Sequence, residues 1–253
     1  SIKKNKTRNV IFDWQTQNLS TPTGVGQLEG FELSRSASPA TVRESNVTMI
    51  LKRDATVSNT QASSDPAGKG KGEMAWQMSV AAKDLKRDVE TAICQNFAKN
   101  AGNATTVRAT RSFEAWAVNA SRGSGGAAGT TSAAATDGTQ RALTETLFMD
   151  VMTLCFQNGG EPSLAICGPV NKQKISDFTG RASAREVIGA DEVQQSVAIY
   201  ISDFGTVKIM ASNFSRERSV LLVDAKTKLL TVEMGLEISN ALAHGVVADL
   251  TIT

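Results

Sequence analysis

The sequence predicts an α+β fold, and three changes in hydrophobic pattern along its 253 residues support this prediction. Residues 1–72 alternate polar with β-forming residues and contain three of the five prolines, without a helical period. At Glu73 a helical period begins abruptly, and from about Val197 strand-forming residues dominate again. Helices and strands that are segregated along a chain in this way are typical of α+β domains.

The N-terminal region is predicted to form an arm and an extended loop. Val10, Phe12 and Trp14 alternate with Ile11, Asp13 and Gln15, which indicates a strand with an aromatic face. Residues 47–57 repeat the alternation and are a second strand candidate. Between them, residues 20–39 are rich in Gly, Ser, Thr and Pro, a composition typical of a mobile loop.

A long amphipathic helix is predicted from Glu73 to about Lys99. At 1.5 Å per residue it would be about 40 Å long, and Gly102 is placed to end it. Its charged face carries Lys83, Lys86, Arg87 and Glu90, for which a solvated surface is the simplest interpretation. The apolar face recurs at steps of three and four residues: Met74, Met78, Ala81, Leu85, Val89, Ala92 and then Phe97.

The middle of the chain alternates flexible, helical and strand-forming sequence. Residues 122–132 are rich in Gly, Ala and Thr, which predicts a flexible segment. A helix is expected to start at Asp137 and to end at Asn158. A short helix with Ile175 and Phe178 should follow a buried strand. The strands expected from here to the C-terminus are residues 164–167, 197–201, 207–210, 220–223 and 229–252.

Composition argues against several functional classes. Lys and Arg number 27 against 25 for Asp and Glu, which is too even for a dedicated nucleic-acid binder. Cys94, Cys155 and Cys167 are an odd number in apolar surroundings, as expected for reduced core thiols. We find no apolar run of about 20 residues and no secretory signal, so we expect no membrane span and no export by that route. The first residue is Ser, which is consistent with a processed or trimmed product.

Catalytic motifs are missing from the sequence. The single histidine, His244, cannot supply a metal cluster, and its apolar neighbours favour a structural role over that of a general base. Residues 123–132 lack the Lys of a phosphate-binding loop, and no Gly-x-Ser-x-Gly elbow occurs. Adjacent carboxylates such as Asp191 and Glu192 are typical of a solvated surface. We therefore expect no enzyme, no metal and no cofactor.

Five stretches resemble the major head proteins of a tailed-phage family, the one typified by the capsid protein of phage SU10. They follow the same order along the chain: residues 8–16, 73–77 running into 85–90, 158–162 through 174–180, 200–208, and 243–249. The resemblance implies the Hong Kong 97 type of capsid fold. Such a fold has an N-terminal arm, an extended loop, a peripheral domain built on a long spine helix, and an axial domain.

The resemblance also implies a division of the chain. Residues 1–72 would form the arm, the extended loop and the first peripheral strand, and residues 73–104 the spine helix. Residues 105–205 would form the axial domain, and residues 206–253 would complete the peripheral domain. The sequence departs from the family pattern before Trp14 and at residues 225–228, where its segments are shorter.

By this resemblance the chain is a structural major capsid protein. It would assemble with copies of itself into the hexamers and pentamers of an icosahedral head around double-stranded DNA, which it would contact without sequence specificity. Cement, portal and scaffolding proteins are further partners of such a subunit. It would belong to the virion, assemble in the bacterial host cytoplasm and need no membrane. The alternatives are the shell of a cellular nanocompartment, a decorating or fibre protein, and an enzyme with an unrecognised site.

Residues on the arm and the long helix are candidates for contacts between subunits. An extended strand and loop outside a local core need a neighbour to cover them, and dense balanced charge suits polar contacts between copies. Trp14 is the candidate anchor, with packing inside its own subunit as the alternative. The candidates are Val10, Phe12, Trp14, Arg35, Arg43, Arg53, Lys83 and Arg87.

Overall fold

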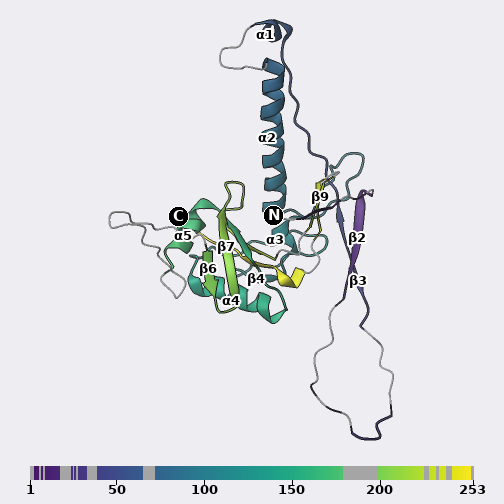
Figure 1. Ribbon diagram of the computed structural model, residues 1–253, viewed down its shortest axis with the longest axis vertical. Coiled ribbons are helices and arrows are strands. Elements are labelled where there is room, and N and C mark those ends of the chain that lie inside the picture. Colours follow the sequence, from purple (N-terminus) through teal and green to yellow (C-terminus); the bar gives the residue numbers. More distant parts are fainter. Residues whose placement is uncertain are drawn as a thin grey trace.

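The fold is described from a computed structural model, in which the chain is markedly elongated (Figure 1). A central body carries one long helix that projects from one end and a two-stranded ribbon whose tip, residues 28–32, lies at the other. The residues described are 3–5, 7, 9–17, 24, 26, 28–32, 39–64, 72–178, 199–224, 228–231, 234–237 and 241–251.

The long helix is α2, Glu73–Cys94, which is five residues shorter than the sequence predicts. It ends because Gln95 is extended, with its N–H bonded to the carbonyl of Thr91. Gly102 lies beyond the helix, with φ +73°, inside the loop that the bridge between Asn100 and Ala109 closes. A short helix, α1 (Asn59–Ser63), lies beside the outer end of α2.

The ribbon consists of β2 (Ile11–Thr16) and β3 (Val42–Val47), which pair antiparallel from Ile11 opposite Val47 to Thr16 opposite Val42. The first strand lies where the sequence predicts it. The second does not, because the pairing ends at Val47, where the predicted strand begins. Residues 51–58 have the alternating pattern but no partner strand, and they run extended along α2 (Figure 1).

A six-stranded mixed sheet forms the body. The helix α4 (Glu145–Gln157) starts eight residues after the predicted Asp137, because Thr144 caps it by accepting a bond from the N–H of Leu147. Another helix, α5 (Pro169–Ser176), follows β5 and contains Ile175 as predicted, but it ends before Phe178. In order across the sheet, the strands are β4 (Asn119–Ser121), β11 (Gly245–Val247), β8 (Val220–Val223), β5 (Leu164–Cys167), β7 (Gly205–Ala211) and β6 (Ile199–Ser202).

Two apolar cores cover opposite faces of this sheet. In β8 all four residues are buried, with Val220 and Leu222 in the core beneath α4 and α5. Leu221 and Val223 point into the second core, which contains α3 (Phe113–Trp116). A strand buried on both faces is a continuous apolar run, which is why the sequence locates β8 correctly.

The C-terminal region is less continuous than predicted. Instead of one strand run from residue 229, it contains β9 (Lys228–Thr231), β10 (Met234–Glu237), a 3₁₀ turn at Ala241–Ala243 and then β11. The strands β9 and β10 form a separate sheet with β1 (Lys3–Asn5). The expected boundary after residue 205 falls just inside β7, which pairs with β6, so it does not separate two sheets.

The Gly-rich segment is packed, contrary to the expectation of a flexible linker. A Cβ added at Gly123 would lie 1.9 Å from the carbonyl oxygen of Thr139, and one at Gly129 would lie 2.4 Å from that of Ala115. Glycine is required here because backbone approaches backbone. Composition alone misled the prediction, since the same residues suit both close packing and flexibility.

Candidate subunit interface

The foot of the ribbon is anchored in its own chain. Phe12 is 8% exposed, and the Trp14 ring lies 5.7 Å from it and 5.5 Å from the ring of Trp116 on α3. Arg111 covers the other side of this group, with its guanidinium 4.1 Å from the Trp116 ring. Trp14 therefore packs at least partly within its own subunit, the alternative considered from sequence.

Asn46 fixes β3 to the body. It is fully buried, and its side-chain amide donates to the carbonyl of Leu236 at 2.7 Å. Its Oδ1 accepts from the N–H groups of Arg111 and Val47, each at 2.9 Å. Nearby, the Lys99 ammonium donates to the Ser45 hydroxyl at 2.8 Å. Sequence analysis missed Asn46 because it precedes the strand predicted at residues 47–57 and its partners Leu236 and Arg111 lie far along the chain.

Three apolar side chains of the ribbon remain exposed. Val10 is 45% exposed, Ile11 50% and Val42 56%. Arg43 donates to the carboxylate of Asp13 on the paired strand, from Nε at 2.9 Å, while its side chain stays largely in solvent. Arg35 lies outside the described residues.

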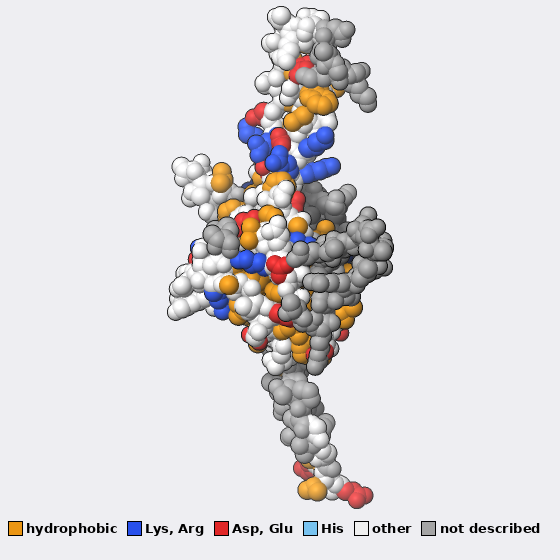
Figure 2. All heavy atoms as spheres, turned by 90° about the vertical axis from the view of Figure 1, so that its left-hand side faces the viewer, with side chains coloured by type: hydrophobic (Ala, Val, Ile, Leu, Met, Phe, Trp, Pro, Cys, Tyr) orange, Lys and Arg blue, Asp and Glu red, His pale blue; other side chains and the backbone are white. Residues whose placement is uncertain are grey.

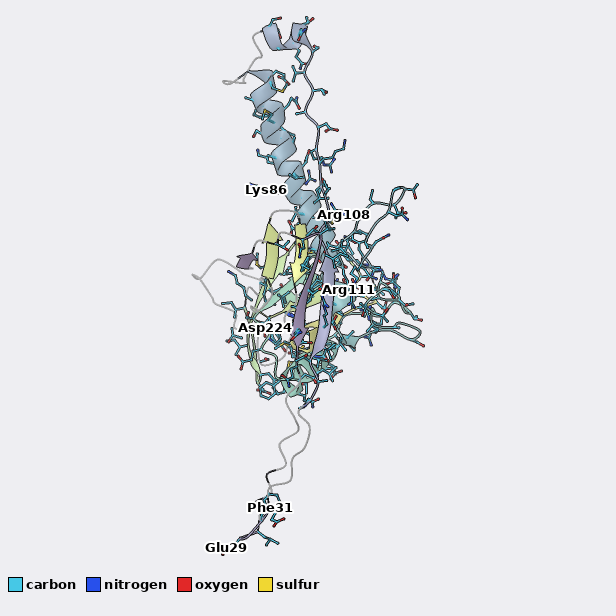
Figure 3. All side chains as sticks on the ribbon, turned by 90° about the vertical axis from the view of Figure 1, so that its right-hand side faces the viewer. Glu29, Phe31, Lys86, Arg108, Arg111 and Asp224 are labelled. Carbon is cyan, nitrogen blue, oxygen red and sulfur yellow. The ribbon has the colours of Figure 1, made fainter. Side chains whose placement is uncertain are left out.

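The ribbon tip, residues 28–32, carries two uncovered apolar side chains at the far end of the molecule (Figure 3). Leu28 is 88% and Phe31 49% exposed. A tight turn presents them: the Phe31 N–H bonds to the Leu28 carbonyl at 3.1 Å, and Gly30 has φ +88°. Glu29 and Glu32 make the tip acidic.

The apolar stripe of α2 is covered only at its inner end. Ala92 is buried and Leu85 half-buried, but Met74 and Met78 are 46% and 61% exposed. Trp76 is exposed as well. Figure 2 shows hydrophobic side chains near the outer end of the helix, above a band of Lys and Arg side chains. Met74, Trp76 and Met78 remain exposed at this outer end, although Glu73 is buried there and α1 lies beside it.

Charges along α2 are partly paired. Arg53 donates twice to the carboxylate of Asp88, at 2.5 Å, and this bond lowers the pKa of Asp88. Arg87 lies 3.3 Å from Asp84 and 5.0 Å from the Phe214 ring. Lys83 and Lys86 are exposed on the same helix. The mixed pattern leaves two lysines available at the surface.

The described residues contain no catalytic arrangement that we can identify. His244 is 1% exposed, stands edge-on to Phe113 at 5.0 Å, and accepts the Asp224 N–H at Nδ1. Burial lowers its pKa to about 4 and raises the pKa of each buried cysteine thiol. No group of metal-binding side chains occurs in the described parts of the chain. The structural roles predicted for the histidine and the cysteines are thus supported.

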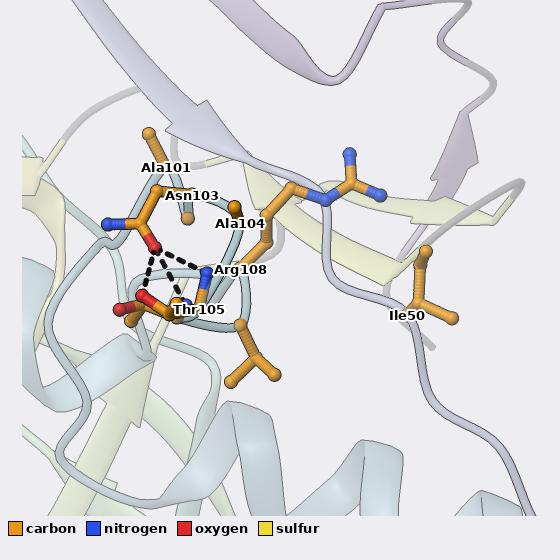
Figure 4. A pocket seen from close by; sticks show the side chains of 9 residues that line it. Ile50, Ala101, Asn103, Ala104, Thr105 and Arg108 are labelled. Atoms are coloured by element: carbon orange, nitrogen blue, oxygen red, sulfur yellow. Dashed lines mark hydrogen bonds between the residues drawn. The ribbon is translucent and has the colours of Figure 1, made fainter.

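Among the described residues, two open pockets on the body are candidate sites. The first, of about 500 Å³, lies between Ile50 and the loop 101–108, whose turn is held by three bonds to Asn103 Oδ1 (Figure 4). The second, of about 600 Å³, lies on the sheet between Glu90 of α2 and Met210 of β7. Neither lining includes a histidine or cysteine among its described residues, and neither suggests catalysis.

Comparison with known proteins decides the family. The family model described as SU10 major capsid protein matches residues 1–227. This chain belongs to that family. The major capsid protein of Escherichia phage Phieco32 is 32% identical over 97 residues, which are 38% of this chain and 27% of that relative. The match with this curated relative therefore spans about a quarter of the relative's length.

Solved structures share the fold of this family member. The capsid asymmetric unit of cyanophage A-1(L) matches with a TM-score of 0.63 at 10% identity, covering 97% of this chain and 89% of that one. The capsid of an empty GTA particle matches with a TM-score of 0.58 at 8% identity, covering 99% and 88%. The predicted α+β fold of the Hong Kong 97 type is confirmed. Among the helices described, none is long and apolar enough to span a bilayer.

Proposed function

We propose that this chain is a non-enzymatic shell subunit, the major capsid protein of a tailed phage. Copies would form the hexamers and pentamers of an icosahedral head around double-stranded DNA, in the host cytoplasm, with portal, scaffolding or cement proteins as further partners. One observation carries the proposal beyond family membership. The chain has two uncovered apolar surfaces, the ribbon tip and the outer end of α2, at opposite ends of the molecule.

We propose that the ribbon tip of one copy contacts the outer end of α2 on the next. The tip offers Leu28 and Phe31, and α2 offers Met74 and Met78. The charges are complementary too, because acidic residues flank the tip and Lys83 and Lys86 follow the apolar end of α2. A chain cannot join these surfaces itself, since they point away from each other (Figure 1). Such patches are typical of interaction sites.

The experiment compares Phe31→Ser with Phe97→Ser, since Phe31 and Phe97 are 49% and 47% exposed. We expect Phe31→Ser to yield folded subunits that form few or no particles in electron micrographs. Phe97→Ser should assemble normally. Normal particles from Phe31→Ser would contradict the contact.

A charge exchange tests the polar part of the contact. Glu29→Lys with Glu32→Lys should weaken assembly, and so should Lys83→Glu with Lys86→Glu, because each places like charges together. Combining all four changes should restore particles. If each pair impairs assembly and the combination does not rescue it, the two surfaces do not meet.

The contents of purified particles test the proposed capsid role separately. Nuclease-protected double-stranded DNA is expected. Recovery of enzyme cargo without DNA would instead identify the shell of a cellular nanocompartment. If particles form normally but carry only enzyme cargo, the contact between the ribbon tip and α2 would still be supported. The proposed role as a phage capsid protein would be wrong.

The division into arm, spine helix, axial domain and return strands remains part of this proposal, with one adjustment. We propose that β8 and β11 belong with the axial sheet, because they pair with β5 and β4. The roles of Val10, Phe12, Trp14, Arg43 and Arg53 in contacts between copies also remain proposals. So does that of Arg87.

A further inference from the structure

Residues 123–139 form a closed surface loop whose ends touch. Gly123 packs against the backbone of Thr139, and the Thr139 N–H bonds to the Ser124 carbonyl at 2.9 Å. Inside the loop, Ala127 and Thr136 form a two-way bridge. The backbone groups of such a loop bond to one another, and its two ends lie close together. The loop can therefore move without displacing the elements on either side of it.

This loop buries little apolar surface. Ala135 is its single buried hydrophobic residue, whereas most of its other residues are exposed. It nevertheless lies over α3, with Gly129 pressed onto the backbone of Ala115. Segments with few apolar contacts have low local stability, so polar bonds must hold this one in place.

Those bonds come from a cluster of charged groups. Arg216 bridges the loop to α3, because it donates to Asp137 and, at 3.0 Å, to the buried carboxylate of Glu114. Arg218 reaches the Gly138 carbonyl at 2.9 Å and Asp249 at 3.1 Å. On the opposite side of the loop, the Asn96 side chain makes two bonds to the backbone of Ala135.

Asp137 is the only charged residue that the loop itself contributes. Three cations face it, Arg216, Arg218 and Arg122, and the bond from Arg216 lowers the pKa of its carboxyl. Without its charge, these three arginines would face only Glu114 and Asp249, the two buried carboxylates that bind them. The loop would then lose its main ionic attachment while the cluster beneath it kept its own.

We propose that residues 123–139 are a lid over α3, that the lid opens as a unit, and that the Asp137–Arg216 ion pair is its latch. Opening would uncover Glu114 and the α3 helix whose Trp116 supports the ribbon at Trp14. The lid is a property of the single chain and does not rest on the proposed assembly.

Amide hydrogen exchange, read by mass spectrometry on the full chain, tests the lid. In Asp137→Asn we expect exchange of residues 123–139 to accelerate by about tenfold or more, the factor that accompanies loss of a charged hydrogen bond. Exchange in α4 and β5 should not change. The matched control is Asp54→Asn, which removes an exposed ion pair with Lys52 and should leave the lid unaffected.

A second variant, Asn96→Ala, removes the two hydrogen bonds to Ala135 and should accelerate amide exchange in the same residues. Two results would overturn the proposal. One is unchanged exchange of residues 123–139 in both variants. The other is equal acceleration throughout the chain, because the ion pair would then stabilise the whole fold and not a lid.

Discussion

Asn46 holds the foot of the ribbon through bonds that no neighbour could replace. Asn46→Ala would leave the Leu236 carbonyl and the Arg111 N–H buried without their partner. We expect the free energy of unfolding to fall by about 2–3 kcal/mol. Urea denaturation of the unassembled subunit measures this. Asn59→Ala, at an exposed position of α1, should change it by less than about 0.5 kcal/mol.

His244 makes stability depend on pH in a defined window. Its pKa is about 4 in the folded chain against 6.5 ordinarily, so unfolding takes up a proton between these values. The contribution of His244 to the free energy of unfolding should be complete above pH 6.5. It should fall by up to about 3 kcal/mol as the pH drops toward 4. Since this is the sole histidine, His244→Asn should flatten the unfolding free energy across that window. An unchanged slope would contradict the assignment.

Polar residues were the hardest to place from sequence. Asn46 and Asp137 each look like ordinary surface residues, and Asp137 even resembles a helix cap. Their roles come from partners far along the chain, Leu236 and Arg216, which no local pattern reveals. His244 was easier, because its apolar neighbours already indicated burial.

Among the elements, the glycine-rich loop depends on backbone contact. Gly123→Ala would place a methyl group 1.9 Å from the Thr139 carbonyl oxygen, which cannot withdraw as a side chain could. We expect a loss of about 1–3 kcal/mol in the free energy of unfolding, measured by thermal or urea denaturation. Gly26→Ala is the control, because a Cβ there meets nothing within 4 Å. Equal effects would show that contact is not the cause.

The helix α2 should respond differently at its two ends. Leu85→Ala, at a half-buried site, should lower the unfolding free energy of a single subunit by about 1–2 kcal/mol. Met78→Ala, at a site 61% exposed, should lower it by less than about 0.5 kcal/mol. In assembly assays the order should be reversed. Equal assembly defects would argue against a contact at the outer end.

Elements with an uninterrupted local pattern were predicted well. The start of α2 and the bounds of β5 and β8 follow from periodicity or from a short apolar run. Where a strand needs a distant partner, the prediction failed. Residues 47–57 alternate as a strand does, but only Val47 belongs to the ribbon ladder, and residues 50–57 form no strand. Local sequence sets the tendency to form a strand, and pairing with a distant segment decides whether the strand forms.

At the scale of the whole molecule, the contact we propose joins unlike surfaces, so its two halves can be disabled separately. A tip-defective copy, Phe31→Ser, keeps its α2 surface, and a copy with Met74→Ser and Met78→Ser keeps its tip. Mixing them should give short soluble oligomers and no shells, detected by native mass spectrometry. Full shells from the mixture would show that assembly proceeds through other surfaces.

The apolar face of α2 is buried at its inner end and exposed at its outer end, and this difference affects how a shell corrects errors of assembly. In the outermost turns Met74, Trp76 and Met78 stay exposed, so these turns have little apolar support from their own chain, and weakly supported helical turns fray in water. Binding of a neighbour there must order these turns. The entropy lost in this ordering weakens each individual contact between subunits. A copy placed wrongly holds by one such weak link and drops off, while a copy placed correctly is held by several.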